Sequence, residues 1–140
     1  MADLIIEFPG VPVAKARARL GRNHNIYTPA PTAIYQDALG YAVRASMGRT
    51  HKRLTGPVEL CLVVRLPIPI HWTIARKAAA RAGKLRPAVK PDIDNFLKMV
   101  ADACTGIAFT DDRQIVRSVV DKIYSDVPGI RFQITAMGQT

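Results

Sequence analysis

The sequence predicts a single α+β domain, in which a small mixed or antiparallel sheet carries packed helices. Short apolar runs with strand-like character lie near both ends of the chain and in its middle, and longer segments repeat apolar residues at helical spacing. Their order is β-α-β-(α)-α-β-β, without internal repeats or an interdomain linker. The chain has 140 residues, enough for one domain with its own core, so residues 1–140 are expected to form one unit.

The first half of the chain predicts a strand over residues 4–8, a basic loop over 15–22 and a helix over 29–47. Thr28 is in position to cap that helix. Residues 57–66 then alternate as a strand, which places one set of apolar side chains on the same side: Val58, Leu60, Leu62, Val64 and Leu66.

The second half predicts a basic, Ala-rich helical stretch over residues 73–82 and a strong helix over about 93–104. The apolar stripe of the second helix consists of Ile93, Phe96, Leu97, Val100, Ala101 and Cys104. Residues 114–124 and 129–137 are predicted to pair as a terminal hairpin around the turn Asp126-Val-Pro-Gly129.

The charge of the chain favours a polyanionic partner. The formal net charge is +9 and the pI is about 10.1. Residues 1–90 carry 15 Lys and Arg against 4 Asp and Glu, whereas residues 91–140 carry 5 against 7. Because phosphate contacts supply most non-specific affinity for nucleic acid, DNA or RNA is the leading candidate. The alternative is a solvated basic surface without such a role.

The sequence gives no indication of a membrane or secreted protein. The N-terminus lacks the pattern of a signal peptide, and no apolar run approaches the roughly 20 residues that span a bilayer. Cys61 and Cys104 lie in apolar segments, as expected for reduced core thiols. We therefore expect a cytoplasmic protein with no membrane partner and no small-molecule cofactor.

Acidic residues are concentrated in one part of this basic chain. Five of the eleven carboxylates fall within 21 positions: Asp92, Asp94, Asp102, Asp111 and Asp112. No His or Cys lies near enough in sequence to Asp92 and Asp94 to complete a zinc site. Hard oxygen ligands of this kind suit Mg²⁺, with Mn²⁺ as a substitute.

The predicted helix arranges part of this cluster. Pro91 disfavours helix before it, so Asp92 falls near the N-cap and Asp94 in the first turn. The helix N-terminus favours negative charge there. Lys98 lies one turn beyond Asp94, on a face that the apolar stripe leaves free. Carboxylates that bind a metal beside a lysine indicate metal-assisted phosphodiester hydrolysis.

Each of these residues also has a simpler interpretation. Asp92 can act as a helix cap alone. Asp94 and Lys98 can form a surface ion pair of small energetic value. The Asp111-Asp112 pair can be an acidic turn. Asp102 shares the face of Lys98, but anchoring of a neighbouring group is the favoured interpretation for it.

These residues resemble the RusA family of Holliday-junction resolvases, found in bacteria and their phages. The resemblance covers nearly the whole chain and includes the region of Trp72; the spaced acidic pattern is its most specific part. The matching residues are Lys90-Pro-Asp92-Ile-Asp94-Asn95-Phe-Leu-Lys98, Asp102, Gly106-Ile-Ala-Phe-Thr-Asp111-Asp112-Arg-Gln114-Ile115, Lys122, and upstream Phe8-Pro-Gly-Val-Pro-Val-Ala-Lys15-Ala-Arg17 and Tyr27-Thr-Pro29.

The resemblance implies a homodimeric, Mg²⁺-dependent endonuclease of α+β fold that nicks two strands of a four-way junction symmetrically. It places Asp92, Asp94 and Asp112 on the family's essential acidic positions, as metal ligands, and Lys98 on its essential lysine. Asp111 is then a neighbour that shapes the site. The segment of residues 68–85 is longer and more helical than in the shortest family members. Three roles are possible for this segment: a dimer element, a DNA-contacting arm or a packing element.

Basic residues outside the acidic cluster are candidates for phosphate contact. The candidates are Lys15, Arg17, Arg19 and Arg22 in the basic loop, with Arg86 and Lys90 nearer the acidic cluster. For three further residues, a solvent-exposed position on a helix and contact with DNA are equally favoured: Arg76, Lys77 and Arg81. Trp72 is assigned to packing in preference to stacking on a DNA base.

The sequence thus predicts a bacterial or phage-encoded endodeoxyribonuclease that resolves four-way junctions with Mg²⁺. One alternative keeps the site and changes the substrate to flaps, forks or other branched DNA. The other is a DNA-binding accessory protein whose carboxylates are structural.

Overall fold

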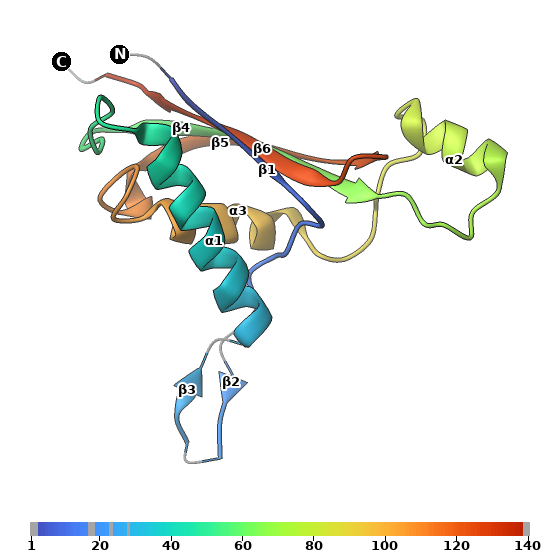
Figure 1. The fold of residues 1–140 in the computed structure, drawn as a ribbon, viewed down its shortest axis with the longest axis horizontal. Helices are drawn as coiled ribbons and strands as arrows, with labels where there is room; N and C mark the ends of the chain where they lie inside the picture. The colour runs from blue at the N-terminus through green and yellow to red at the C-terminus, as the bar shows by residue number, and fades with distance from the viewer. Residues whose placement is uncertain (1–2, 17–18, 23, 28, 139–140) are drawn as a thin grey trace.

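The computed structural model describes residues 3–16, 19–22, 24–27 and 29–138. They form an α+β domain in which a four-stranded mixed sheet carries helices α1 and α3 on one face (Figure 1), so the predicted fold class is confirmed. The helices are α1 (Ala30–Met47), α2 (Ile74–Arg81), α3 (Ile93–Cys104) and the short 3-10 helix η1 (Asp112–Gln114). The strands are β1 (Leu4–Pro9), β2 (Arg19–Leu20), β3 (Ile26–Tyr27), β4 (Val58–Pro67), β5 (Ile115–Ser125) and β6 (Gly129–Ala136).

The order of strands in the main sheet is β1-β6-β4-β5. Strand β4 pairs antiparallel with β6 on one side and parallel with β5 on the other. The predicted hairpin between residues 114–124 and 129–137 is therefore wrong, because β4 lies between the two strands. The turn residues at 126–129 show where the chain reverses direction, but they do not show whether another strand lies between the two that they connect. Residues 126–128 extend far enough, on the order of 10 Å, to cross two strand spacings.

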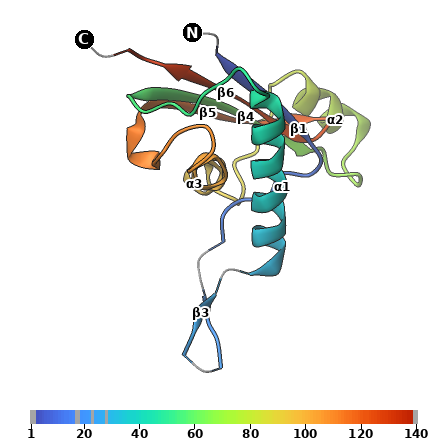
Figure 2. The ribbon, with the colours of Figure 1, turned by 60° about the vertical axis from the view of Figure 1, so that its left-hand side comes forward.

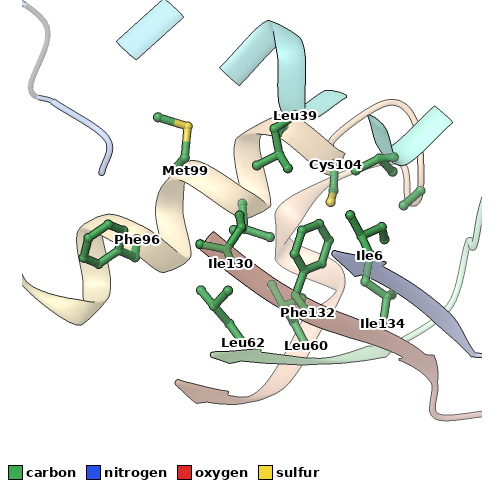
Figure 3. Packing of buried hydrophobic residues seen from close by; sticks show 14 of the residues in the cluster. Ile6, Leu39, Leu60, Leu62, Phe96, Met99, Cys104, Ile130, Phe132 and Ile134 are labelled. Carbon is green, nitrogen blue, oxygen red and sulfur yellow. The ribbon is translucent and has the colours of Figure 1, made fainter. Parts of the chain in front are cut away.

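The hydrophobic core lies between the sheet and the two helices (Figure 3). The alternation predicted for β4 is confirmed, since all five of its expected core residues are buried. On α3 the stripe extends through Met99 and Ala103, which are buried, whereas Ile93 is 47% exposed, contrary to the prediction. Ile93 occupies the first helical position, at the end of the buried stripe.

The boundaries of the predicted helices agree with the structure to within one residue. The hydroxyl of Thr73 caps α2 by accepting a hydrogen bond from the Arg76 amide at 3.2 Å. Helix α1 has Pro29 at its N-cap position, and the capping predicted for Thr28 falls outside the described residues.

The basic loop continues into a small hairpin, β2-β3, which the sequence did not predict. It projects away from the sheet beyond the first turn of α1 (Figures 1 and 2). Helix α2 lies at the end of the sheet away from the N- and C-terminal ends (Figure 1). Across the described ranges, none of the helices combines the length and apolar character needed to cross a membrane.

Candidate active site

The N-terminus of α3 presents two exposed carboxylates. Asp92 occupies the N-cap position but makes no capping hydrogen bond through its side chain, and Asp94 lies in the first turn. Among the described residues, neither forms an ion pair. The structure therefore gives no support to Asp92 as a cap alone, or to a simple surface pair between Asp94 and Lys98. Both carboxylates are free to bind a ligand.

Lys98 connects α3 to the loop that enters β5. Its ammonium lies 3.0 Å from Asp112 Oδ2 and 3.0 Å from Asp102 Oδ1. Asp102 is one turn further along the same helix. The hydrogen bond to Asp102, followed by the one to Asp112, raises the pKa of Lys98 above its ordinary value of 10.5. Lys98 is therefore a fixed cation across the neutral pH range.

Asp102 anchors two lysines rather than one. Besides Lys98, it pairs with Lys15, whose Nζ lies 3.2 Å from Asp102 Oδ2 and donates to Gln36 Oε1 at 2.6 Å. The Lys15 amide donates to the Asn95 carbonyl at 3.0 Å, so the segment after β1 is tied to the first turn of α3. The predicted anchoring role of Asp102 is confirmed by these contacts. Lys15, a predicted phosphate contact, is partly enclosed in this network.

The two acids of the Asp111-Asp112 pair have different environments. The Asp111 carboxylate caps η1 by accepting from the Arg113 amide at 3.0 Å, in a capping box with Gln114. The Asp112 carboxylate faces Lys98 instead, and the hydrogen bond from Lys98 is the main cause that lowers the pKa of Asp112 below its usual value. Asp111 thus shapes the loop, and Asp112 is the acid presented beside α3.

Gln114 and Lys122 hold this geometry in place. In the sequence, both stood out only as members of the pattern shared with the RusA family. Gln114 donates through Nε2 to the carbonyls of Leu54, at 3.0 Å, and Gly56, at 2.9 Å. It also accepts from the Thr110 and Asp111 amides. These four contacts fix the loop that carries Asp112.

Lys122 fixes the other half of the site. Its ammonium, on β5, donates to the carbonyl of Val89 at 2.6 Å and to that of Pro91 at 2.8 Å. The Lys90–Pro91 peptide bond between them is cis. Lys122 therefore holds the segment that leads directly into Asp92. These contacts join residues some 30 positions apart, so local sequence patterns could not reveal them.

An open hollow of about 630 Å³ lies beside Asp92. One wall comes from residues 12–16 and the other from residues 90–92 with Asn95. Apolar side chains line much of it, and Lys15 and Lys90 contribute positive charge. The hollow is thus adjacent to the exposed Asp92, and Lys90 is the cation of its lining that has no ion pair among the described residues.

The remaining predicted phosphate contacts are spread over the molecule. Arg22 is exposed in the turn of the β2-β3 hairpin, and Arg86 and Lys90 are exposed between α2 and α3. Arg17 lies outside the described residues, and only the backbone of Arg19, in β2, is described. The structure brings Lys15 and Lys90 to the hollow; Arg22 and Arg86 lie on other segments.

The donor set suits a hard divalent cation, although the structure does not assemble a complete cage. Within the described ranges, no three Asp, Glu, His or Cys side chains stand close enough to hold a metal ion together. Asp92, Asp94 and Asp112 are thus not gathered into one three-ligand cluster. Their oxygen donors still fit Mg²⁺, which is commonly bound by one or two carboxylates together with substrate phosphates.

Comparison with known proteins identifies the family. The sequence model of the family described as "Endodeoxyribonuclease RusA" matches residues 9–135. The chain belongs to the RusA endodeoxyribonuclease family. The RusA match includes α3, η1 and β5, and therefore every residue of the candidate site described above. Membership of the RusA family implies a nuclease of the resolvase type with DNA as its substrate.

A bacterial relative shows how far the similarity extends. The chain is 35% identical over 128 residues to "Uncharacterized protein YqaN" of Bacillus subtilis (strain 168). The alignment covers 89% of this chain and 90% of the relative. The similarity therefore extends over nearly the full length of both proteins.

Proposed function

We propose that this protein is a Mg²⁺-dependent, structure-selective endonuclease that resolves four-way DNA junctions by paired symmetric nicks. Residues 1–140 act as one RusA-like domain, and two copies form a homodimer in the bacterial cytoplasm. A dimer presents two equivalent sites to a junction with two equivalent strands, which matches the symmetry of the task. Family membership supports the nuclease class, and the arrangement of side chains at α3 supports the chemistry.

The contact between Lys98 and Asp112 is the observation that carries this proposal. It places the acid of the η1 loop beside the helix that presents Asp92 and Asp94. Asp94 lies one turn before Lys98, or about 6 Å along the helix axis. Two exposed acids, a third acid and a fixed cation therefore lie on two adjoining segments, α3 and the η1 loop, and such charged groups can stabilise the transition state of phosphodiester hydrolysis.

Asp92, Asp94 and Asp112 are the residues that would hold Mg²⁺. When bound, Mg²⁺ supplies charge neutralisation at the phosphate and activation of water. Asp92 and Asp94 are available for this role because the described residues offer them no ion pair. Asp112 is kept ionised by its low pKa. Mn²⁺ is expected to replace Mg²⁺, because it accepts the same oxygen donors.

Lys98 stabilises the charge that develops on the phosphate. An ammonium has three N–H donors, and two of those on Lys98 bind Asp102 and Asp112, which leaves the third for a phosphate oxygen. In the reaction, a water oxygen forms a bond to phosphorus and the bond to the 3′ oxygen breaks. The attacking water gives up a proton and the 3′ oxygen takes one, so the products are a 3′-hydroxyl and a 5′-phosphate, which can be religated.

Basic residues around the site hold the arms of the junction. Lys15 and Lys90 line the hollow beside Asp92, and Arg22 and Arg86 are exposed in the β2-β3 hairpin and between α2 and α3. Arg17 and Arg19 complete the proposed set through their positions in the same basic loop. These contacts orient DNA without reading its sequence.

Parallel cleavage assays test this function. Labelled four-way junction, flap and linear duplex are incubated with the protein, with and without Mg²⁺. We expect paired nicks in the junction that require Mg²⁺, with flap and duplex cut at least about tenfold more slowly. Preferential cutting of the flap would assign a different branched substrate. Binding of the junction without nicks in any strand would indicate an accessory protein and contradict the proposal.

A further inference from the structure

Between β4 and α3 the chain forms a projecting segment, of which the proposed function uses only Arg86 and Lys90. This segment, residues 68–91, is called the basic arm here; it contains α2 and lies off one end of the sheet (Figure 1). Its charge is one-sided: it has no Asp or Glu, and its six cationic residues are Arg76, Lys77, Arg81, Lys84, Arg86 and Lys90. A concentration of one sign of charge on one projecting element creates a local field for a polyanion.

The basic arm has a fixed position on the sheet. The Trp72 ring packs edge-on against Tyr124 of β5, with 5.2 Å between the ring centroids, which confirms its predicted packing role. Arg81 Nε lies 2.7 Å from Asp126 Oδ2, just beyond the end of β5. Ala80 is buried, and Lys122 holds the end of the arm through its carbonyl contacts. A ligand that binds the arm therefore meets a surface that is already ordered.

Lys90 lines the hollow beside Asp92, and the other five cations of the arm divide into two groups. Arg76 lies over the Trp72 ring, 4.1 Å from its centroid, and Arg81 pairs with Asp126, so both help to fix the arm. Within the described part of the chain, Lys77, Lys84 and Arg86 make no side-chain hydrogen bond or ion pair. Lys84 and Arg86 are exposed and Lys77 is half-buried. These three charges are available to an external partner.

The arm leads directly into the candidate active site. Its last residue, Pro91, precedes Asp92, and Lys122 holds both the Val89 and the Pro91 carbonyls. The C-terminal end of the arm therefore lies directly beside the carboxylates at the start of α3. Resting on the proposed function, we propose that the basic arm binds the phosphate backbone of one duplex arm of the DNA substrate, with Lys77, Lys84 and Arg86 as its phosphate contacts. Residues 68–85 then serve DNA binding in preference to packing or dimerisation.

The test uses binding, so that it does not depend on cleavage. The variant Lys77→Gln/Lys84→Gln/Arg86→Gln removes three charges and keeps side chains of comparable length. Its affinity for labelled four-way junction and for linear duplex is measured in EDTA over a series of salt concentrations. We expect the Kd to rise about tenfold or more for both DNAs, and the slope of log K against log salt to fall by about 3.

A matched variant separates the arm from the overall charge of the protein. Arg49→Gln/Lys52→Gln/Arg53→Gln removes the same charge from exposed residues between α1 and β4, at the opposite end of the sheet (Figure 1). We expect a smaller loss for this control. Circular dichroism and thermal unfolding establish that both variants fold. The variant Lys77→Arg/Lys84→Arg/Arg86→Lys keeps the charges and is expected to bind as the wild type does.

Three results would overturn the role of the arm. They are an unchanged Kd and salt slope in the arm variant, an equal loss in both Gln variants, or a change in oligomeric state by sedimentation with unchanged DNA binding. The last would make the arm a subunit contact.

If the wild-type protein nicks no DNA but the arm variant shows the expected binding loss, the proposed function fails and the arm inference stands. Junction nicking by the wild type, together with unchanged binding by the arm variant, would support the proposed function and refute the role of the arm.

Discussion

Lys98 Nζ lies 3.0 Å from Asp112 Oδ2, which joins helix α3 to the loop that enters β5. Lys98 also pairs with Asp102, while Asp92 and Asp94 stay exposed at the start of the helix. The contact links two parts of the acidic motif that are separated by the last turns of α3 and residues 105–111. Of the Asp111-Asp112 pair, Asp112 is therefore the acid that belongs to the candidate site.

The first prediction separates the two adjacent acids. Asp111→Ser retains a side chain that can cap η1, so cleavage of a junction is expected to stay within a few-fold of the wild type. Asp112→Asn removes the carboxylate beside Lys98, and kcat is expected to fall by more than about 10²-fold. Single-turnover cleavage of a labelled junction measures both. Equal loss of activity in the two variants would contradict the division of roles.

The second prediction concerns pH and the Lys98–Asp112 pair. Lys98 lowers the pKa of Asp112 from an ordinary value of 3.8, so Asp112 stabilises the fold above that value and loses this effect as the pH falls through its folded pKa. The pKa of Lys98 is raised from 10.5, so its contribution is present below 10.5 and is lost as the pH rises through its higher folded pKa. The pair is therefore intact over the whole neutral range.

Urea unfolding of Asp112→Asn and wild type, followed by circular dichroism, measures this contribution. Both side chains are partly exposed, so the difference in unfolding free energy is expected to be small, about 0.2–1 kcal/mol. It is expected to be constant from about pH 5 to about pH 9 and to shrink below about pH 4. Asp121→Asn, an exposed acid on β5 without an ion pair among the described residues, is the control. A large change in the difference near neutral pH would refute this assignment.

The third prediction assigns Lys122 a positioning role. Lys122→Met removes the two hydrogen bonds that hold the Val89 and Pro91 carbonyls, so the segment before Asp92 loses its support. The Mg²⁺ concentration for half-maximal cleavage is expected to rise about 10- to 100-fold, the usual effect of losing a partner that orients a metal ligand. Junction binding in EDTA is expected to change much less.

Lys122→Arg, which keeps a donor at this position, is expected to recover part of the Mg²⁺ response. Lys52→Met, on an exposed loop residue, is the matched control and is expected to cleave as the wild type does. A loss of thermal stability in Lys122→Met with an unchanged Mg²⁺ dependence would show that Lys122 supports the fold alone.

The sequence was sufficient for the parts of the structure that depend on local signals. The helix over residues 93–104 could be predicted because Pro91, the acidic first turn and an apolar stripe all lie within or next to it. The order of strands could not be predicted in the same way. Strand β4 lies between β5 and β6 although it is far from both in sequence, and no turn signal encodes that insertion.

The candidate site shows the same division. Asp92, Asp94 and Lys98 could be placed together because they share one helix. Distant segments must pack together before Lys15 can pair with Asp102 or Lys122 can reach the Pro91 carbonyl. From the sequence, Lys15 was therefore predicted to be an unpaired phosphate contact. The different environments of Asp111 and Asp112 also needed the structure, because both belong to one short acidic motif.

The most direct test of the proposed chemistry is the mapping of nicks on a synthetic mobile four-way junction by wild type and Asp94→Asn. Wild type is expected to give symmetric nicks in two strands with Mg²⁺ and none without it. Asp94→Asn is expected to give no nicks, while it binds the junction as tightly as the wild type or more tightly, because one repulsive charge is removed. Full cleavage by Asp94→Asn, or the same nicks in EDTA, would contradict a metal-dependent site at the start of α3.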